Sequence, residues 1–408
     1  MALKTIDDLG GSLQGKRVLL RVDFNVPVSH GKITDDFRIS SALPTIRKAM
    51  QLGAKVILAS HLGRPAETGY EEALSLKPIA ARLQALLGAP VTFIPDCIGP
   101  AAEQAVAALA DGGVALLENL RFYPGEAAND EAFASKLARL ADIYVNDAFG
   151  TSHRDAASMT GVPRLLGGGV AGYLVAKEVE AISQLLNQPA RPLVAVLGGA
   201  KVSDKLLVIK NLLSVVDEVL IGGAMAYTFM KALGQDVGSS KYETVVVDKK
   251  GVEKPVLQMA QAILELASAK GKQLILPIDH VVAASLDAGA PTRVVERIEA
   301  GWIGVDIGPA TRRLYADKLH AARTAFWNGP MGVFEIKGFD EGTLAIARAF
   351  ADLTGRGATT IVGGGDSAAA IRQMGFDTRV THVSTGGGAA LEMLEGKALP
   401  GVTALDLK

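Results

Sequence analysis

Short apolar runs of Val, Ile and Leu alternate along this chain with segments that show the apolar periodicity of helices. Residues 74–88 and 130–141 are two such helical segments, and the apolar runs include VLLRV, VILAS and LVAVL. Continuous apolar strands that alternate with amphipathic helices are typical of parallel sheets covered on both faces. We therefore predict an α/β fold.

The residues that follow these strands differ between the two halves of the chain. In the first half the strands run into Arg, His or Asp, as in VLLRVDFNVP, VILASHLGRP, VALLENLRF and YVNDAFGTSHR. In the second half they run into glycines that open helices, as in VAVLGGAKVSDK, EVLIGGAMAYTF, TIVGGGDSAAA and HVSTGGGAA. Ligands of open parallel sheets bind beyond the carboxyl ends of the strands. The first half therefore has the features of a small-anion site and the second those of a nucleotide-phosphate site, a combination that indicates phosphoryl transfer.

The composition argues against several other kinds of protein. The 408 residues hold 42 Lys and Arg against 43 Asp and Glu, so no overall charge attracts a nucleic acid. No apolar run approaches the ~20 residues that a membrane-spanning helix needs, and the N-terminus lacks the apolar core of a signal peptide. Cys97 is the only cysteine, which rules out an intrachain disulfide and fits a reducing compartment. We expect a cytoplasmic protein without a membrane or nucleic-acid partner.

The length of the chain predicts about two or three domains, at roughly 150 residues per domain. A boundary is expected between Thr151 and Pro192, where a glycine-rich stretch precedes one helical segment and PARP breaks the chain before a new strand. We predict a first domain over residues 1–171, a bridging helix or hinge over 172–190, and a second domain from residue 191. Each domain is predicted to be a Rossmann-like lobe, with a parallel sheet flanked by helices.

Glycine turns before helices are candidate phosphate cradles, because a helix N-terminus offers unpaired N–H groups that glycine lets a phosphate approach. In LGGAKVSDKLLVIKNLL, Gly198 and Gly199 form such a turn. We predict Lys201 just inside the following helix and Lys205 on the same face one turn later, where both can reach nucleotide phosphates. The alternative is that they are solvated surface lysines, as most lysines are.

Two further glycine runs of the second half suggest different tasks. Asp366 follows residues 363–365 at the start of a helix, where it is a candidate Mg²⁺ ligand or, alternatively, a helix N-cap. Gly386, Gly387 and Gly388 repeat the arrangement without an acid, which suits a phosphoryl group that carries negative charge in transit. The alternative is a plain strand-to-helix turn.

Gly167, Gly169 and Gly172 match the spacing of a dinucleotide-binding fingerprint, but no clear strand precedes them and no acid follows about 20 residues later. We interpret them as hinge or packing glycines, in a segment 167–187 that we expect to act as a hinge, and not as the site of a dehydrogenase. GGAKVSDK also lacks the Gly-Lys-Ser/Thr ending of a Walker-type loop.

The first half holds candidate arginines for an anion site, and Arg is favoured where a planar fork must bind phosphate or carboxylate. Arg38 is expected in a polar loop before a helix, whereas four others are expected at or just beyond the ends of successive strands: Arg21, Arg64, Arg121 and Arg154. Each alone is more typical of a surface ion pair. Their recurrence at equivalent strand ends favours a shared site.

Other polar residues accompany these arginines. His61 and His153 are candidates to hydrogen-bond a phosphate oxygen, with a capping or core histidine as the alternative. Asp23 and Asn25 end an apolar strand, where they can orient a hydroxyl-bearing acid or cap neighbouring loops. The expected ligand of this half is a small anion with a hydroxyl group.

Several long motifs occur in one order along nearly the whole chain: RVDFNVP, SHLGRP, ENLRF, GGAKVSDK, FWNGPMGVFE, GGGDS and STGGGAA. In these motifs the chain resembles the phosphoglycerate kinase family. The resemblance implies a two-lobed enzyme that interconverts ATP plus 3-phosphoglycerate with ADP plus 1,3-bisphosphoglycerate, with Mg²⁺ as cofactor and a monomeric state. It also implies that the C-terminal segment, residues 395–408, returns to the first lobe, which leaves residues 191–394 as the nucleotide-binding domain.

Carried over to this sequence, the resemblance implies two sets of site residues. The set for 3-phosphoglycerate is Asp23, Asn25, Arg38, His61, Arg64, Arg121 and Arg154. We add Arg21 to the substrate-binding residues because it belongs to the same basic cluster. The set for the nucleotide is Lys201, Lys205, Gly222, Gly223, Asn328, Glu335, Gly364, Gly365, Asp366 and Ser367, with Asp366 at the metal, Glu335 near the ribose, and Gly222 and Gly223 beside the adenine. Arg38, Lys201 and the Gly386 to Gly388 turn are expected to surround the migrating phosphoryl group.

Two positions depart from the family pattern. HRDAAS places Asp155 where relatives often have a second histidine, and an acid there is expected to weaken the positive field around Arg154. GGGDS has Ser367 where many relatives have Thr, a change that keeps the hydroxyl.

A carboxylate acceptor is already ionised at neutral pH and needs no general base, so catalysis is expected to consist of positioning and charge stabilisation. One alternative is a different two-lobed phosphotransferase that acts on another small phosphorylated acid, because its arginine cluster would look similar. Another is a catalytically silent nucleotide-binding or scaffolding protein. Such a protein is expected to lack Lys201, Asp366 or the arginines, and all of these are present.

Overall fold

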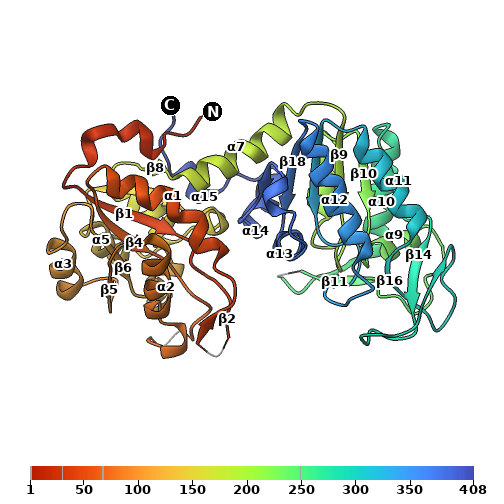
Figure 1. The fold of residues 1–408 in the computed structure, drawn as a ribbon, viewed down its shortest axis with the longest axis horizontal. Helices are drawn as coiled ribbons and strands as arrows, with labels where there is room; N and C mark the ends of the chain where they lie inside the picture. Colours follow the sequence, from red (N-terminus) through yellow and green to blue (C-terminus); the bar gives the residue numbers. More distant parts are fainter. Residues whose placement is uncertain (1, 30, 67–68, 249) are drawn as a thin grey trace. The chain divides into compact units, whose positions relative to one another are not determined.

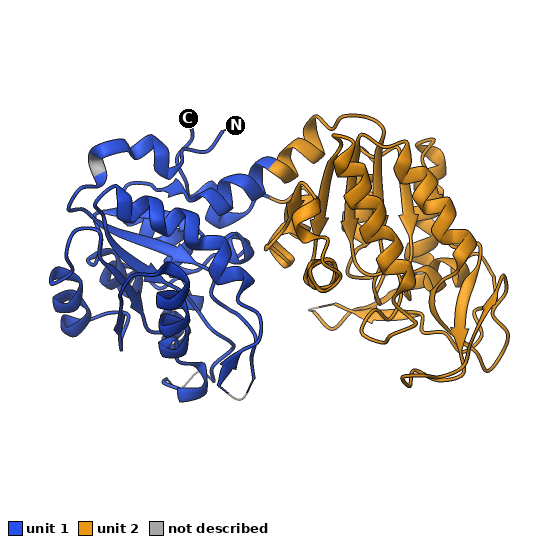
Figure 2. Cartoon of the chain, in the orientation of Figure 1, with its two compact units in different colours: residues 1–180, 398–408 blue, residues 181–397 orange. Residues whose placement is uncertain are grey.

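The computed structural model describes residues 2–29, 31–66, 69–248 and 250–408. This part of the chain divides into two compact units (Figure 2). Unit 1 runs to Glu180 and also contains Ala398–Lys408, whereas unit 2 is Ala181–Lys397. The division lies inside helix α7 (Tyr173–Asn187), in the segment for which the sequence predicts a bridging helix. The chain rejoins unit 1 at Ala398, slightly later than the expected residue 395.

Unit 1 is built on a parallel sheet with the strand order β5-β6-β4-β1-β7-β8 (Figure 1). The strands are β1 (Arg17–Val22), β4 (Lys55–Ala59), β5 (Val91–Ile94), β6 (Val114–Leu117), β7 (Ile143–Asp147) and β8 (Val170–Ala171). The helices are α1 (Phe37–Gln51), α2 (Lys77–Leu87), α3 (Pro100–Ala107), α4 (Pro124–Ala127), α5 (Glu131–Ala138), α6 (Val162–Leu165) and α15 (Pro400–Thr403), beside the ribbon β2 (Val28–Ser29) and β3 (Lys32–Ile33). The helices predicted over 74–88 and 130–141 correspond to α2 and α5.

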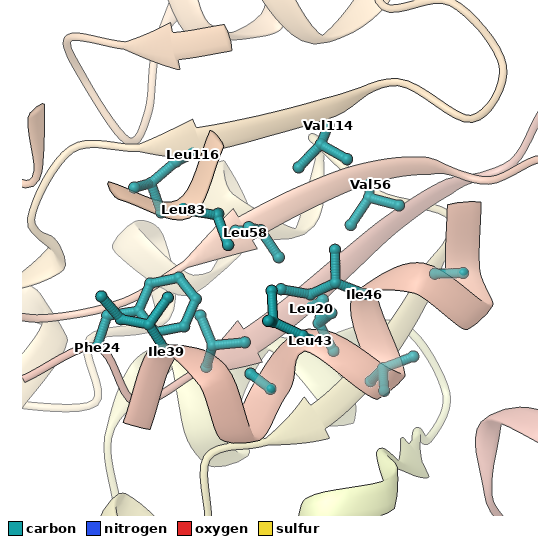
Figure 3. Close-up of a cluster of buried hydrophobic side chains, with 14 of the residues drawn as sticks. Leu20, Phe24, Ile39, Leu43, Ile46, Val56, Leu58, Leu83, Val114 and Leu116 are labelled. Atoms are coloured by element: carbon teal, nitrogen blue, oxygen red, sulfur yellow. The ribbon is translucent and has the colours of Figure 1, made fainter. Parts of the chain in front are cut away.

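The core of unit 1 shows why α1 packs on this sheet (Figure 3). Ile39, Leu43 and Ile46 recur at helical spacing, so they share one face of α1. They meet Leu20 of β1 and Leu58 of β4, and all of these side chains are buried. This apolar contact fixes α1, and with it the residues of its first turn, beside the end of β1.

Unit 2 repeats the architecture with the strand order β13-β10-β9-β17-β18-β19. Figure 1 labels β10, β9 and β18 of this sheet. The strands are β9 (Leu193–Leu197), β10 (Glu218–Ile221), β13 (Gln273–Ile275), β17 (Thr324–Asn328), β18 (Thr359–Gly363) and β19 (His382–Val383). The helices are α8 (Leu206–Leu212), α9 (Met225–Ala232), α10 (Val256–Ala269), α11 (Pro309–His320), α12 (Glu341–Gly355), α13 (Gly365–Gln373) and α14 (Gly388–Leu394). Both units thus have the predicted α/β architecture of a parallel sheet flanked by helices.

Unit 2 also contains antiparallel elements that the sequence analysis did not predict. Strands β14 (His280–Ala283), β15 (Thr292–Val295) and β16 (Ile303–Ile307) form a separate sheet. β11 (Val245–Val247) pairs with β12 (Glu253–Pro255) inside KYETVVVDKKGVEKP, a segment that is typical of a surface loop by its charge. The pairing follows from three consecutive β-branched residues, which favour extended backbone.

Backbone hydrogen bonds join the C-terminal segment to unit 1. The Lys4 N–H donates to the Asp406 carbonyl at 2.9 Å, and the Gly401 N–H donates to the Ser152 carbonyl at 2.8 Å. The Lys408 ammonium lies 3.0 Å from the Asp8 carboxylate. Among the described residues, no helix has the length and apolar character needed to cross a membrane.

Candidate active site

The strand order of unit 1 brings the predicted anion-site residues to one edge of the sheet. β6, β4, β1 and β7 are neighbours, and their carboxyl ends lead towards Arg121, His61, Asp23 and Arg154. Carboxyl ends of parallel strands lie on the same side of a sheet. Segments that are far apart in the sequence therefore contribute to one basic cluster, which we define by the five arginines at positions 21, 38, 64, 121 and 154.

Arg38 lies in the first turn of α1, so its predicted place in a loop is wrong. The helix begins earlier because the Asp35 carboxylate accepts the Phe37 N–H at 2.9 Å and starts the turn. The Arg38 guanidinium donates to the Asp23 carboxylate at 3.2 Å and to the Asn25 carbonyl at 2.9 Å. Its side chain is 33% exposed, which leaves this fixed positive charge accessible at the sheet edge.

Arg21 lies inside the unit, with an exposure of 1%. Its guanidinium donates to the Ser158 hydroxyl at 2.8 Å, to the Val22 carbonyl and to Nδ1 of His61 at 3.2 Å. Because Arg can only donate, His61 Nδ1 accepts and the ring proton resides on Nε2. Burial lowers the pKa of His61 to about 3, and the charges of Arg21 and Arg121 act in the same direction. His61 is therefore a neutral hydrogen-bond donor near pH 7.

Asp23 is the carboxylate of this cluster. Burial opposes its ionisation, but the positive surroundings of His61, Arg38 and Arg21 outweigh burial and lower its pKa. Since His61 is neutral near pH 7, the two arginines supply this attraction. The Asn25 N–H adds a hydrogen bond to the carboxylate at 3.1 Å. Asp23 thus stays ionised and holds Arg38 in place.

The other arginines differ in their surroundings. Arg121 is half-buried and donates to the Gly63 carbonyl at 2.6 Å, while the Gly63 N–H donates to the Asn25 side chain at 2.9 Å. Burial, followed by the charges of Arg21 and Arg154, lowers the pKa of Arg121, which reflects the closeness of like charges. These contacts tie the loops after β1, β4 and β6 together.

Arg64 and Arg154 are exposed, and His153 is half-buried beside Arg154. The Asp155 carboxylate accepts hydrogen bonds from the Asn129 amide at 2.8 Å and from the Thr160 hydroxyl at 2.5 Å. Asp155, the acid that departs from the family pattern, is therefore hydrogen-bonded to two side chains of unit 1.

A pH titration tests the neutral state of His61. We expect its ring signals in NMR to stay those of the Nε2–H tautomer from about pH 8 to pH 5, where an ordinary histidine gains its proton. The unfolded chain takes up this proton near the usual pKa of 6.5, whereas the folded site resists until about 3. The contribution of His61 to the free energy of unfolding is therefore expected to fall as the pH falls from about 6.5 to about 3. An inflection of the His61 signals between pH 5 and 8 would contradict the assignment.

The strand order of unit 2 places the loops after β10, β9, β17 and β18 side by side. A pocket of about 250 Å³ lies among them and β16. Its lining residues are Gly199, Ala200, Gly223, Ala224, Tyr227, Gly304, Val305, Pro330, Met331, Gly332, Val333, Glu335 and Asp366. Gly223 is one of the glycines that this packing requires, because its φ is +64° and an added Cβ would lie 2.5 Å from the Gly199 nitrogen.

Three of the predicted nucleotide residues line this pocket: Gly223, Glu335 and Asp366. Gly222 lies behind the wall, where an added Cβ would lie 2.4 Å from the sulfur of Met331. Because Gly222 has no side chain, Met331 has room to line the pocket.

Other predicted residues join the loops of the pocket to each other. The Asn328 amide donates to the Gly363 carbonyl at 2.8 Å, next to the predicted residues Gly364 and Gly365. The Ser367 hydroxyl donates to the same carbonyl at 2.6 Å and accepts the Gly329 N–H at 2.8 Å. These residues hold the loop after β17 against the start of α13.

Sequence reasoning missed part of the pocket wall. Residues 330–333 lie within the motif FWNGPMGVFE and Tyr227 lies within AMAYTF, so those motifs carried a signal. Gly304 and Val305 come from β16 of the antiparallel sheet, and they carried none. Nothing in a local pattern tells which face of the parallel sheet a separate small sheet will approach.

The predicted placement of the two lysines in a helix is wrong. α8 begins at Leu206, so Lys201 lies in the preceding loop and Lys205 is the N-cap residue, without a capping hydrogen bond from its side chain. The loop is held open because the Ser203 N–H and hydroxyl donate to the Glu243 carboxylate at 2.9 and 2.7 Å. Lys201 is exposed, whereas burial lowers the pKa of Lys205.

The two remaining glycine turns open helices as predicted. α13 has Gly364 as its N-cap, with φ of 92°, so Asp366 lies in the first turn and the N-cap alternative for Asp366 is wrong. α14 begins at Gly388 with Gly387 as its N-cap, and the Gly386 N–H donates to the Ser384 hydroxyl at 3.0 Å. Asp366 is thus an exposed carboxylate at the pocket.

Comparison with known proteins identifies relatives along the full length of the chain. The family model described as phosphoglycerate kinase matches residues 6–397. The phosphoglycerate kinases of Chlorobaculum tepidum and Dictyoglomus turgidum are 54% and 52% identical, each over 100% of both chains. The solved phosphoglycerate kinase structure from Coxiella burnetii matches with a TM-score of 0.85, 42% identity and 98% coverage of both chains. The one from Pyrococcus horikoshii matches with a TM-score of 0.84 and 35% identity, over 99% of this chain and 98% of that one.

A parallel sheet with a basic edge in one unit and a glycine-lined pocket with carboxylates in the other define an α/β phosphotransferase. Its acceptor group is a carboxylate, as in the proteins it matches over their whole length. The chain belongs to the phosphoglycerate kinase family.

Proposed function

We propose that this chain catalyses the reversible, Mg²⁺-dependent transfer of a phosphoryl group between ATP and the carboxylate of 3-phosphoglycerate. Unit 1 would bind 3-phosphoglycerate and unit 2 the nucleotide. The observation that carries this division is the arginine cluster at the sheet edge of unit 1 together with the carboxylate-bearing pocket at the sheet edge of unit 2.

For 3-phosphoglycerate, the exposed and half-exposed members of the cluster are the direct contacts: Arg38, Arg64, Arg121 and Arg154. Guanidinium groups bind phosphate and carboxylate through paired, permanently charged donors. His61 adds a neutral donor through Nε2–H, and Asn25 is placed to orient the substrate hydroxyl. Arg21 is a positioning residue in this proposal, because its buried guanidinium donates to Nδ1 of His61.

For the nucleotide, Lys201 and Lys205 would bind phosphates, Glu335 the ribose, and Gly222 and Gly223 would border the adenine. Burial lowers the pKa of Lys205, and the negative charges of Asp204 and Asp366 oppose this lowering. The Lys205 ammonium therefore lies in the electrostatic field of Asp366, which lines the pocket. The loop after β17 and the start of α13 would be held together by Asn328, Ser367 and the Gly364 to Gly365 turn.

Asp366 fits the role of the protein ligand for Mg²⁺. Among the described residues no cluster of three or more metal-binding side chains exists, and Asp366, with Glu335, is one of two exposed carboxylates that line the pocket. Mg²⁺ is commonly held by one or two carboxylates plus substrate phosphates, so a single acid suits it. When bound, the ion neutralises charge on the nucleotide phosphates.

The transfer itself needs positioned charge and no general base, because the acceptor carboxylate is ionised. We assign the migrating phosphoryl group to Arg38, Lys201 and the Gly386 to Gly388 turn at the start of α14. In-line attack requires the reacting atoms at about 3–3.5 Å, so turnover requires that the substrates bound to the two units come within that distance. We propose that residues 167–187 hinge the motion that brings them together, in a monomeric protein of the cytoplasm.

A coupled assay tests this function directly. ATP turnover is expected only when both 3-phosphoglycerate and Mg²⁺ are present, and chelation of the metal is expected to abolish it. Other phosphorylated hydroxy acids serve as controls for the acceptor. ATP turnover that ignores 3-phosphoglycerate but responds to another acid would favour the alternative phosphotransferase, and no turnover with any acceptor would favour a silent nucleotide-binding protein.

A further inference from the structure

Residues 329–340 connect β17 to α12 and supply much of the pocket wall, including Met331, Val333 and Glu335. The loop is anchored at separate points. The Met331 N–H donates to the Thr343 hydroxyl at 3.0 Å, and the Val333 N–H donates to the Val305 carbonyl at 2.9 Å. The wall that carries Glu335 therefore depends on contacts to β16 and to α12.

Asp306 of β16 lies where both ends of this loop meet the strand. It is 1% exposed, and its carboxylate accepts the Gly342 N–H at 2.6 Å and the Ile307 N–H at 2.8 Å. Gly342 belongs to the first turn of α12, just after the loop. An added Cβ would lie 2.2 Å from Asp306 Oδ1 at Gly342 and 2.5 Å from it at Gly332. Glycines at both ends thus allow one carboxylate to touch both ends of the loop.

A buried carboxylate is costly at such a position. Burial raises the pKa of Asp306 to about 7, although the Gly342 N–H and the Arg312 charge oppose the rise. A neutral side chain of similar size would avoid that cost. The two oxygens accept two backbone N–H groups, however, and an amide can accept only one of them without bringing its own donors against the other.

We propose that Asp306 is a positioning residue for nucleotide binding: its carboxylate holds the 332–342 segment on β16 and thereby keeps the Glu335 side of the pocket in place. This inference rests on the proposed assignment of the pocket to the nucleotide. It adds Asp306 to the residues proposed to support nucleotide binding. Asp306 does not line the pocket and acts only through the 332–342 segment.

Two variants disturb the contact between Asp306 and Gly342, one at each residue. Asp306→Asn keeps the size of the side chain and removes one acceptor. Gly342→Ala keeps Asp306 but places a Cβ 2.2 Å from its Oδ1 and 2.5 Å from Ile307 Cγ1, so the carboxylate and its neighbour on β16 must both move, although alanine is the better helix former. The matched control is Asp279→Asn. Asp279 is another buried helix-capping carboxylate of unit 2, which accepts the Ala310 and Thr311 N–H groups at 2.9 and 2.7 Å at the start of α11.

Calorimetric titration of the full chain with Mg·ADP, and separately with 3-phosphoglycerate, tests the proposal alongside thermal unfolding. We expect the Kd of Mg·ADP to rise about tenfold or more in Asp306→Asn and Gly342→Ala, because the hydrogen bond from the buried Gly342 N–H to the Asp306 side chain is weakened or displaced. The Kd of 3-phosphoglycerate is expected to stay unchanged in both. Asp279→Asn is expected to lower Tm without changing the Kd of Mg·ADP.

A Glu335→Ala variant separates the inference from the function on which it rests. If Glu335→Ala weakens Mg·ADP binding while Asp306→Asn and Gly342→Ala do not, the positioning role is refuted and the pocket assignment stands. If all three bind Mg·ADP as the wild type does, the assignment of the pocket to the nucleotide is refuted as well. If Asp306→Asn does not fold, Gly342→Ala alone decides.

Discussion

Replacing Arg38 by alanine is expected to lower kcat by roughly 10³- to 10⁵-fold, or about 4–7 kcal/mol in the activation free energy. The guanidinium is held by the Asp23 carboxylate and the Asn25 carbonyl, and only 33% of its side chain is exposed. A charge that is fixed before the reaction stabilises a migrating phosphoryl group without reorganisation. Steady-state kinetics at saturating ATP and 3-phosphoglycerate measure the effect as a change in kcat.

Two further variants control for charge and shape. Arg38→Lys keeps the charge but loses the planar fork, so we expect an intermediate kcat. Arg47→Ala removes an exposed arginine from the same helix, α1, and is expected to leave kcat close to the wild-type value. A loss of less than tenfold in Arg38→Ala, with Tm preserved, would remove Arg38 from the transition state.

The arrangement of unit 1 was predictable because a parallel sheet imposes it. Residues just after β1 and β4 are distant in sequence, yet the Asn25 side chain accepts the Gly63 N–H at 2.9 Å. The order of the strands brings these loops together, so motifs at strand ends allow a prediction of which loops are neighbours, as the contact between Asn25 and Gly63 illustrates. The periodicities that define strands and helices are local, and local patterns are what a sequence displays directly.

The depth of individual side chains was less predictable. Both Arg21 and Arg64 were expected near strand ends, but Arg21 lies within β1 and is buried, whereas Arg64 lies in the loop after β4 and is exposed. The difference arises because the turn Ala157–Gly161 supplies Ser158 to the guanidinium of Arg21. That partner comes from a segment far along the chain, which no pattern around Arg21 reveals.

The start of α8 was mispredicted for a similar reason. The apolar periodicity and the glycine turn favour a helix from about Lys201, but the Glu243 carboxylate binds Ser203 and holds the loop open. Backbone groups that have a side-chain partner elsewhere need no helix to satisfy them. The contact between Ser203 and Glu243, which are 40 residues apart, overrides the local preference for a helix. The contribution of Gly304 and Val305 of β16 to the pocket is likewise a long-range contact that no local pattern indicates.

The second large effect is expected from Asp366→Asn. Amide oxygens are weaker ligands for a hard cation than carboxylate oxygens, and among the described residues Asp366 belongs to no cluster of three or more metal-binding side chains that could replace it. We expect kcat/KM to fall by about a hundredfold at limiting Mg²⁺, and less at saturating Mg²⁺. Calorimetry without turnover offers a second measurement, because the variant is expected to bind ADP with nearly the same affinity with and without Mg²⁺, whereas the wild type binds it more tightly with the ion.

The control is Asp352→Asn, which removes an acid from α12 that is 70% exposed and pairs with Arg379 at 3.5 Å. Such a surface pair contributes little, so wild-type kinetics are expected. A purely structural Asp366 would act as a negative charge in the first turn of α13, worth about 0.3–1 kcal/mol to folding. Asp366→Asn would then lower Tm slightly and leave the Mg²⁺ dependence of ADP binding intact, and that result would exclude Asp366 as the metal ligand.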